Sequence, residues 1–244
     1  MEIKIFATPA ELGQVAAAQC AEIINEAIVS KGKARIALAT GASQFETINA
    51  LTGMNINWNK VEMFHLDEYI GLPESHPASF RKYLKERFLS KVNIGKACLV
   101  DGEDDPQSVI ASLTAAIRTE PIDLGVIGIG ENAHIAFNDP PADFLTQEAY
   151  ICVTLDDACK QQQVREGWFD TIDDVPKQAI SMTVYQIMLC RQIVSCVPYA
   201  VKAKAIKDTL DSPLSNAVPA TMLKTHPCWT LYLDKDSASL IDVV

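Results

Sequence analysis

Residues 36–43 read IALATGAS. Four apolar residues predict a buried strand, the small residues after them predict a tight turn, and a helix is expected from there to about Leu51. Backbone N–H groups in such a turn, together with the positive end of the helix, form a site for an anion. The hydroxyl groups of Thr40 and Ser43 could add donors, although Ser43 could instead be an ordinary helix N-cap.

Strands and helices are expected to alternate along the rest of the chain in the same way. Strands are predicted at residues 3–6, 36–39, 61–66, 99–100, 124–127, 151–154, 193–197 and 229–233. Helices are predicted at residues 9–31, 43–51, 77–88, 106–118, 157–166 and 201–210, whereas residues 181–189 fit either element. Alternation of this kind predicts an α/β protein with a mostly parallel sheet and helices on both faces. In such sheets, ligands bind beyond the carboxyl ends of the strands.

The composition limits the classes of function. The chain has 244 residues, of which 48% are hydrophobic and 21% charged, and its net charge is −10. These values are typical of a globular protein, and an acidic surface repels the phosphate backbone of nucleic acids. No apolar signal core or membrane-length apolar stretch is found, and the seven cysteines lack zinc-site spacing. We therefore expect a reduced, cytoplasmic protein without a metal, a nucleic-acid partner or a membrane partner.

A second polar motif follows the predicted strand at residues 61–66. Residues 64–69 read FHLDEY, so that Asp67 and Glu68 come directly after an apolar run. A carboxylate fixed at the end of a strand is well placed to be a general base. The alternative is that this acid pair caps a helix or lies on the surface.

A third motif, GIGENAHIAFNDP, occupies residues 128–140. Its glycines would allow the backbone to approach a ligand closely. His134 has Asn132 two residues before it and Asp139 five residues after it, which is an arrangement suited to fixing the tautomer of an imidazole that transfers protons. A buried structural histidine is the alternative, and a metal site is less favoured because the other histidines lie in unrelated segments.

Taken together, residues 38–43, 64–80 and 128–140 resemble the glucosamine-6-phosphate deaminase/isomerase family. This family includes galactosamine-6-phosphate isomerases and is related to the 6-phosphogluconolactonases. The resemblance continues through residues 201–205 (VKAKA) and 216–221 (NAVPAT) and so covers nearly the whole chain. It implies one Rossmann-like, doubly wound domain over residues 1–244.

The resemblance also implies a reaction, which is the aldose–ketose isomerisation of a 2-amino-sugar 6-phosphate with release of ammonia and no cofactor. By the family's pattern, Asp67 is the general base and His134 opens the sugar ring. The implied phosphate site consists of Thr40, Gly41, Ala42, Ser43 and Lys202, with Lys204 as the alternative lysine. The residues expected to support the site are Glu68, Tyr69, Gly130 and Ala133.

Two positions depart from the deaminase pattern. Asn132 and Ala133 stand where deaminases usually have Asp-Gly before the histidine, and Asp139 stands in place of a glutamate. Asn132 can hold the ring but carries no charge, and the shorter Asp139 is expected to reach His134 only through backbone adjustment or water. The galactosamine branch resembles the chain better here, so either epimer is open. Arg165 is a weak candidate for a phosphate-binding arginine.

Two further functions and two oligomeric states are compatible with the sequence. The chain could hydrolyse 6-phosphogluconolactone with His134 acting on water, or it could bind a sugar phosphate without turnover. It could be a monomer or a homo-oligomer. Because it ends soon after its last predicted strand, we expect no allosteric site of the kind found in longer, hexameric members of the family.

Overall fold

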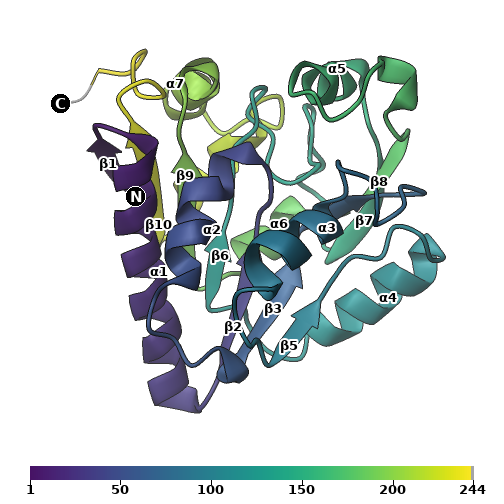
Figure 1. The fold of residues 1–244 in the computed structure, drawn as a ribbon. Coiled ribbons are helices and arrows are strands. Elements are labelled where there is room, and N and C mark those ends of the chain that lie inside the picture. The colour runs from purple at the N-terminus through teal and green to yellow at the C-terminus, as the bar shows by residue number, and fades with distance from the viewer. Residues whose placement is uncertain (243–244) are drawn as a thin grey trace.

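The computed structural model describes residues 1–242, and its centre is a sheet of seven parallel strands (Figure 1). The strand order is β1-β10-β9-β6-β2-β3-β5, and each neighbouring pair is parallel. The strands are β1 (Glu2–Phe6), β2 (Ala34–Leu38), β3 (Val61–His65), β5 (Lys96–Cys98), β6 (Leu124–Val126), β9 (Gln192–Val197) and β10 (Trp229–Asp234). The predicted fold class is confirmed, whereas the assignment of residues 1–244 to one domain stays a prediction.

Helices cover both faces of this sheet, because successive side chains of its strands point to opposite faces. In β2, Ile36 and Leu38 pack into one core with α1 (Pro9–Lys31) and α2 (Phe45–Thr52), whereas Ala37 packs into the other. The first core also receives α3 and the π-helix that continues it, and the second receives α4, α6 and α7. The bounds are α3 (Phe80–Leu84), the π-helix (Lys85–Leu89), α4 (Pro106–Ile117), α6 (Val184–Met188) and α7 (Ala203–Asp211).

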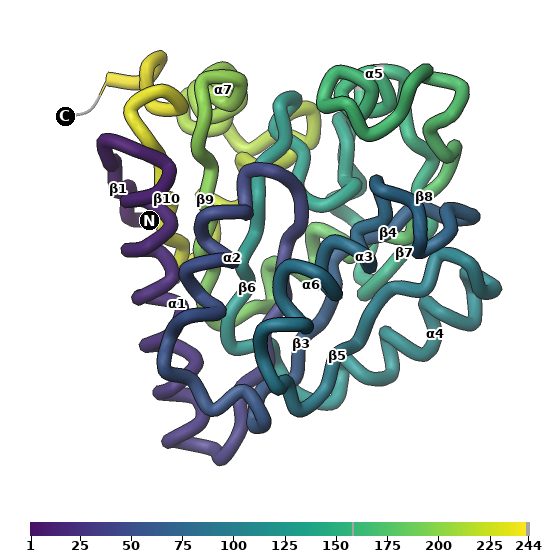
Figure 2. The backbone as a smooth tube through the Cα atoms, in the orientation of Figure 1, coloured from purple at the N-terminus to yellow at the C-terminus, as the bar shows by residue number. Residues whose placement is uncertain are grey.

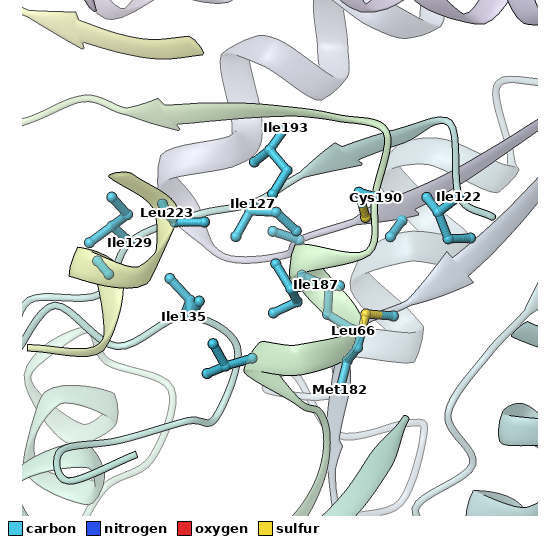
Figure 3. Packing of buried hydrophobic residues seen from close by; sticks show 14 of the residues in the cluster. Leu66, Ile122, Ile127, Ile129, Ile135, Met182, Ile187, Cys190, Ile193 and Leu223 are labelled. Atoms are coloured by element: carbon cyan, nitrogen blue, oxygen red, sulfur yellow. The ribbon is translucent and has the colours of Figure 1, made fainter. Parts of the chain in front are cut away.

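The second core joins the sheet to the segment that carries the third motif. Ile127 and Ile193 from the sheet pack there with Ile187 of α6 and with Ile129 and Ile135 of the motif (Figure 3). Burying aliphatic side chains of this size contributes about 1.5–3 kcal/mol each relative to leaving them exposed. The first half of the motif is therefore packed against the same core as the parallel sheet.

A second, smaller sheet was not predicted. It has three antiparallel strands in the order β4-β8-β7, namely β4 (Asp67–Tyr69), β8 (Gln178–Met182) and β7 (Tyr150–Thr154). The acids after β3 are therefore part of a strand, and the strand expected near residues 151–154 does not belong to the parallel sheet. Residues 181–189, which fitted either a strand or a helix, contain the end of β8 and the whole of α6.

The carboxyl ends of the parallel strands face two helical segments. Helix α5 (Asp157–Arg165) and helix α7 lie at the same end of the molecule (Figures 1 and 2). The 3-10 helix Ala200–Lys202 leads directly into α7, close to the helix predicted at residues 201–210. No helix within residues 1–242 is both long and apolar enough to cross a bilayer.

Candidate active site

A cavity of about 400 Å³ lies between the strand ends, α5 and the 3-10 helix Ala200–Lys202 that precedes α7. All three sequence motifs contribute to its wall, although they are far apart in the chain. The predicted residues that line it are Thr40, Gly41, Ala42, Ser43, Asp67, Gly130, His134 and Lys202. Glu68, Asn132, Ala133 and Asp139 lie behind this wall and do not line it. The expectation that the motifs meet at the carboxyl ends of the strands is confirmed.

The turn after β2 is open toward the cavity. Gly41 has a φ of 96°, a conformation that favours glycine, and its carbonyl accepts a hydrogen bond from the Tyr83 hydroxyl at 3.1 Å. The N-cap residue of the 3-10 helix that follows is Gly41, and that of α2 is Gln44. The alternative in which Ser43 caps the helix is therefore wrong. Ser43 lies inside the 3-10 helix Ala42–Gln44, and its side chain is at the cavity wall.

Asp67 is 6% exposed and faces the cavity from β4. Burial, with the nearby charges of Glu68 and Asp139, raises the pKa of Asp67 to about 8. Desolvation disfavours the charged carboxylate, and two further acids within reach add to that effect. A carboxyl group with such a pKa can both take and return a proton near neutral pH.

Glu68 points away from the cavity and holds the start of α3. Its carboxylate accepts hydrogen bonds from the Ser79 hydroxyl at 2.9 Å and from the backbone N–H groups of Phe80 and Arg81 at 3.2 and 2.7 Å. Burial raises the pKa of Glu68, although these hydrogen bonds act against the rise. The contacts fit the predicted supporting role, since they fix β4 to α3 beside Asp67.

The His134 imidazole is held at one nitrogen by two side chains. Its Nδ1 lies 2.6 Å from Asn132 Oδ1 and 3.1 Å from Asp139 Oδ1, and Asn132 Nδ2 donates to the same Asp139 oxygen at 3.1 Å. Burial alone would raise the pKa of Asp139, but its hydrogen bonds with His134 and Asn132 lower it overall. Because Nδ1 is engaged in this way, Nε2 remains as the nitrogen that can exchange a proton with a ligand.

The backbone of the third motif explains how the short Asp139 reaches His134 without water. Ala133 and Ala136 adopt left-handed conformations, with φ of 63° and 48°. Such values cost alanine free energy and are typical of functional sites. Of the two routes expected for Asp139, backbone adjustment is the one observed. Gly130 is required here as well, since a Cβ at this position would overlap the imidazole ring.

Burial distinguishes the two lysines that were candidates for the phosphate site. Lys202 is 7% exposed and lines the cavity, and burial lowers its pKa although Glu166 and Glu131 act in the opposite direction. Lys204 is exposed and forms an ion pair with Asp208, one helical turn away. The alternative register with Lys204 in the site is therefore wrong.

Several cavity residues were not predicted as part of the site. Gln162 and Gln163 are buried on α5, and the polar run in which they occur was the only signal for them. Arg165, the weak candidate, lines the cavity with its Nη2 2.9 Å from Glu131 Oε2. Within residues 1–242, no three His, Cys, Asp or Glu side chains gather as a metal site requires.

The sequence of the chain matches a known family over most of its length. The model of the glucosamine-6-phosphate isomerase/6-phosphogluconolactonase family matches residues 7–231. The chain belongs to this family. Within it, the glucosamine-6-phosphate deaminases of Oenococcus oeni and Halothermothrix orenii are each 34% identical to the chain. The first alignment covers 99% of both chains, and the second covers 91% of this chain and 94% of the relative.

Two solved structures are also similar to the chain. A monomeric glucosamine-6-phosphate deaminase superposes with a TM-score of 0.89 at 29% identity, covering 99% of this chain and 100% of the other. The 6-phosphogluconolactonase of Thermotoga maritima gives a TM-score of 0.79 at 16% identity over 96% and 99% of the two chains. This second likeness shows a shared fold alone. The resemblance expected from the three motifs is confirmed.

Proposed function

We propose that the chain converts a 2-amino-2-deoxyhexose 6-phosphate, with glucosamine 6-phosphate as the first candidate, to the ketose 6-phosphate and ammonia. The observation that carries this proposal is one cavity that joins a proton-exchanging carboxyl, Asp67, and a tautomer-fixed imidazole, His134, to an anion-binding turn. The family membership and the names of the full-length relatives support the same activity.

The phosphate group would bind at the turn formed by residues 40–43. Backbone N–H groups and two hydroxyls are available there, and Lys202, which lines the same cavity, supplies a positive charge. Binding at this end would direct the sugar ring toward Asp67 and His134.

His134 would open the ring in the first chemical step. With Nδ1 held by Asn132 and Asp139, Nε2 takes the proton of the C1 hydroxyl and returns it to the ring oxygen as the C1–O5 bond breaks. The product is the open-chain amino aldose.

Asp67 would then carry out the isomerisation. Its carboxylate removes the proton from C2, the C2–H electron pair forms a C1–C2 double bond, and the C1 carbonyl pair moves to O1, which takes up a proton to give an enolamine. The same carboxyl group returns the C2 proton to C1, and the nitrogen loses one proton as its lone pair forms the C2 imine, which balances the proton gained by O1. The resulting C2 imine takes up water, and the C–N bond breaks to leave the ketone and ammonia. A pKa of about 8 for Asp67 suits a group that acts as a base and then as an acid in one turnover.

The test is an assay of ammonia and ketose 6-phosphate with glucosamine and galactosamine 6-phosphates side by side. We expect both products in equal amounts from at least one epimer. Asp67→Asn should lower the rate by about 10²–10⁴-fold while sugar-phosphate binding is kept. Asp104→Asn, which changes an exposed acid outside the cavity, is the matched control.

Two results would contradict the proposed reaction, and a third would contradict the role of Asp67 in it. Hydrolysis of 6-phosphogluconolactone above the spontaneous rate, without ammonia release from either amino sugar, would identify a lactonase. Sugar-phosphate binding without any turnover would identify a binding protein. Unchanged turnover by the Asp67→Asn variant would remove Asp67 from the mechanism.

A further inference from the structure

One buried polar side chain behind the anion-binding turn has not been assigned a role. Gln44 follows Ser43 directly, and its side chain is fully buried between the ends of the parallel strands. Its Nε2 donates one hydrogen bond to Ser43 Oγ at 3.0 Å and another to the Cys196 carbonyl at 3.0 Å. Cys196 lies at the end of β9, the strand that leads to Lys202. The amide therefore joins the two chain segments that form the phosphate site.

The orientation of this amide is fixed by its surroundings. The Cys196 carbonyl can only accept a hydrogen bond, so the nitrogen and not the oxygen of the amide must face it. Gly128 makes room for that nitrogen, since a Cβ on Gly128 would lie 3.2 Å from Gln44 Nε2. Within the described residues, Gln44 Oε1 has no hydrogen-bond partner. A buried acceptor left in this state is unfavourable, which suggests that the amide is kept for what its nitrogen does.

The contact with Ser43 has a direct consequence for anion binding. A hydroxyl group has one proton and two acceptor sites, and Gln44 occupies one of these acceptor sites. In residues 1–242, the structure records no protein acceptor for the Ser43 hydroxyl proton, and Ser43 lines the cavity. The proton is thus available to a phosphate oxygen, so Gln44 makes Ser43 a donor toward the cavity.

We propose that Gln44 is a positioning residue for the sugar phosphate, which orients the Ser43 hydroxyl toward the anion; its second hydrogen bond, to the Cys196 carbonyl, holds the amide in the position from which it does so. This inference rests on the proposed function, because it assumes that the turn at residues 40–43 binds the phosphate group. Gln44 acts through Ser43 and touches no substrate itself.

The experiment measures binding of inorganic phosphate by calorimetry, together with the KM and kcat for glucosamine 6-phosphate. The variants are Gln44→Met, Ser43→Ala and the double variant. Each single change should weaken phosphate binding about tenfold and raise KM more than it lowers kcat. If Gln44 acts through Ser43, the double variant should be no weaker than Ser43→Ala alone, whereas independent effects would multiply to about a hundredfold.

Gln186→Met is the matched control, because Gln186 is also a buried glutamine but lies on α6 outside the cavity. It should leave phosphate binding unchanged. Gln44→Glu keeps the shape of the side chain and decides the question if Gln44→Met does not fold. If Gln44 acts through Ser43, any effect of Gln44→Glu on phosphate binding should disappear in the Ser43→Ala background, whereas charge repulsion by an ionised carboxylate would persist there.

Two outcomes would overturn the role of Gln44 while leaving the proposed function intact. These are wild-type phosphate binding by a folded Gln44 variant, and effects of the two single changes that multiply in the double variant. A wild-type protein that neither binds phosphate nor releases ammonia would instead overturn the proposed function, and the role of Gln44 with it.

Discussion

Gly130 shows how one missing side chain can decide the geometry of a site. The His134 ring occupies the space that a Cβ on Gly130 would need. In Gly130→Ala, the ring must turn away, and the contact of Nδ1 with Asn132 Oδ1 is lost. We expect kcat to fall at least about 10²-fold, the usual contribution of a positioned acid–base group, while inorganic phosphate still binds.

The control for this change is Gly53→Ala. Gly53 ends α2 with an ordinary φ of −86°, and a Cβ there would make only a normal contact with the Ala50 carbonyl. Its kinetics should match the wild type. A Gly130→Ala enzyme with wild-type kcat would show that the orientation of His134 is not required for turnover.

Asn132 gives a second prediction at the scale of one residue. In Asn132→Asp, a carboxylate would replace the amide oxygen that now lies 2.6 Å from His134 Nδ1. A negative charge at this distance favours the protonated imidazole. If neutral His134 opens the ring, the acidic limb of the kcat/KM profile should move to higher pH.

The activity of Asn132→Asp on each of the two epimers distinguishes three roles of Asn132. A gain with glucosamine 6-phosphate would indicate that Asn132 weakens deaminase chemistry. A loss confined to galactosamine 6-phosphate would indicate an adaptation to that epimer. Profiles that superimpose on the wild type for both sugars would mean that Asn132 only stabilises the turn.

At the scale of elements, the start of α7 separates two lysines that are two residues apart. Lys202 precedes the first helical residue and is buried in the cavity wall, whereas Lys204 lies on the exposed side and pairs with Asp208. We expect Lys202→Met to raise KM about 10- to 100-fold with a smaller change in kcat, because the phosphate is not the reacting group. Lys204→Met is the matched control and should be nearly silent. A larger effect from Lys204 would contradict the placement of this helix.

The elements also show what could be predicted from sequence alone. Strands such as β2 are buried on both faces, so their apolar runs are visible in the sequence, and the turns that follow them mark the site. The small sheet was not predicted, because β4 consists of Asp67, Glu68 and Tyr69 and has no apolar period. It forms by pairing with β8, more than a hundred residues away.

The details of the site depended on conformations that local sequence does not specify. Alanine seldom adopts a positive φ, yet two alanines do so on either side of His134 and bring Asp139 to the ring. Gln44 is a polar residue in a turn, which usually means exposure, and its burial follows from the space beside Gly128. The motifs that line the cavity were thus predictable from the sequence, whereas the hydrogen bonds among their side chains depend on the fold.

For the whole molecule, the buried carboxyl of Asp67 links the stability of the fold to pH. In the unfolded chain, an aspartate has its ordinary pKa near 4, whereas in the fold the pKa of Asp67 is about 8. Between these values the unfolded chain is ionised at this position and the folded chain is not, so the unfolded state binds fewer protons. The free energy of unfolding therefore falls as pH rises through this window, by up to about 1.4 kcal/mol per pH unit, and levels off above pH 8.

Asp67→Asn removes this dependence, because the amide does not titrate. We expect the variant to gain stability relative to the wild type as pH is raised from 5 to 8, with little further change above pH 8. Urea unfolding at one-unit pH intervals measures the difference, and a constant offset from lost or new contacts does not affect its slope. Asp104→Asn, at an exposed acid, should show no such slope. A stability difference for Asp67→Asn that stays constant from pH 5 to 8 would mean that the carboxyl is already ionised in the fold at these pH values, and would contradict the raised pKa of Asp67.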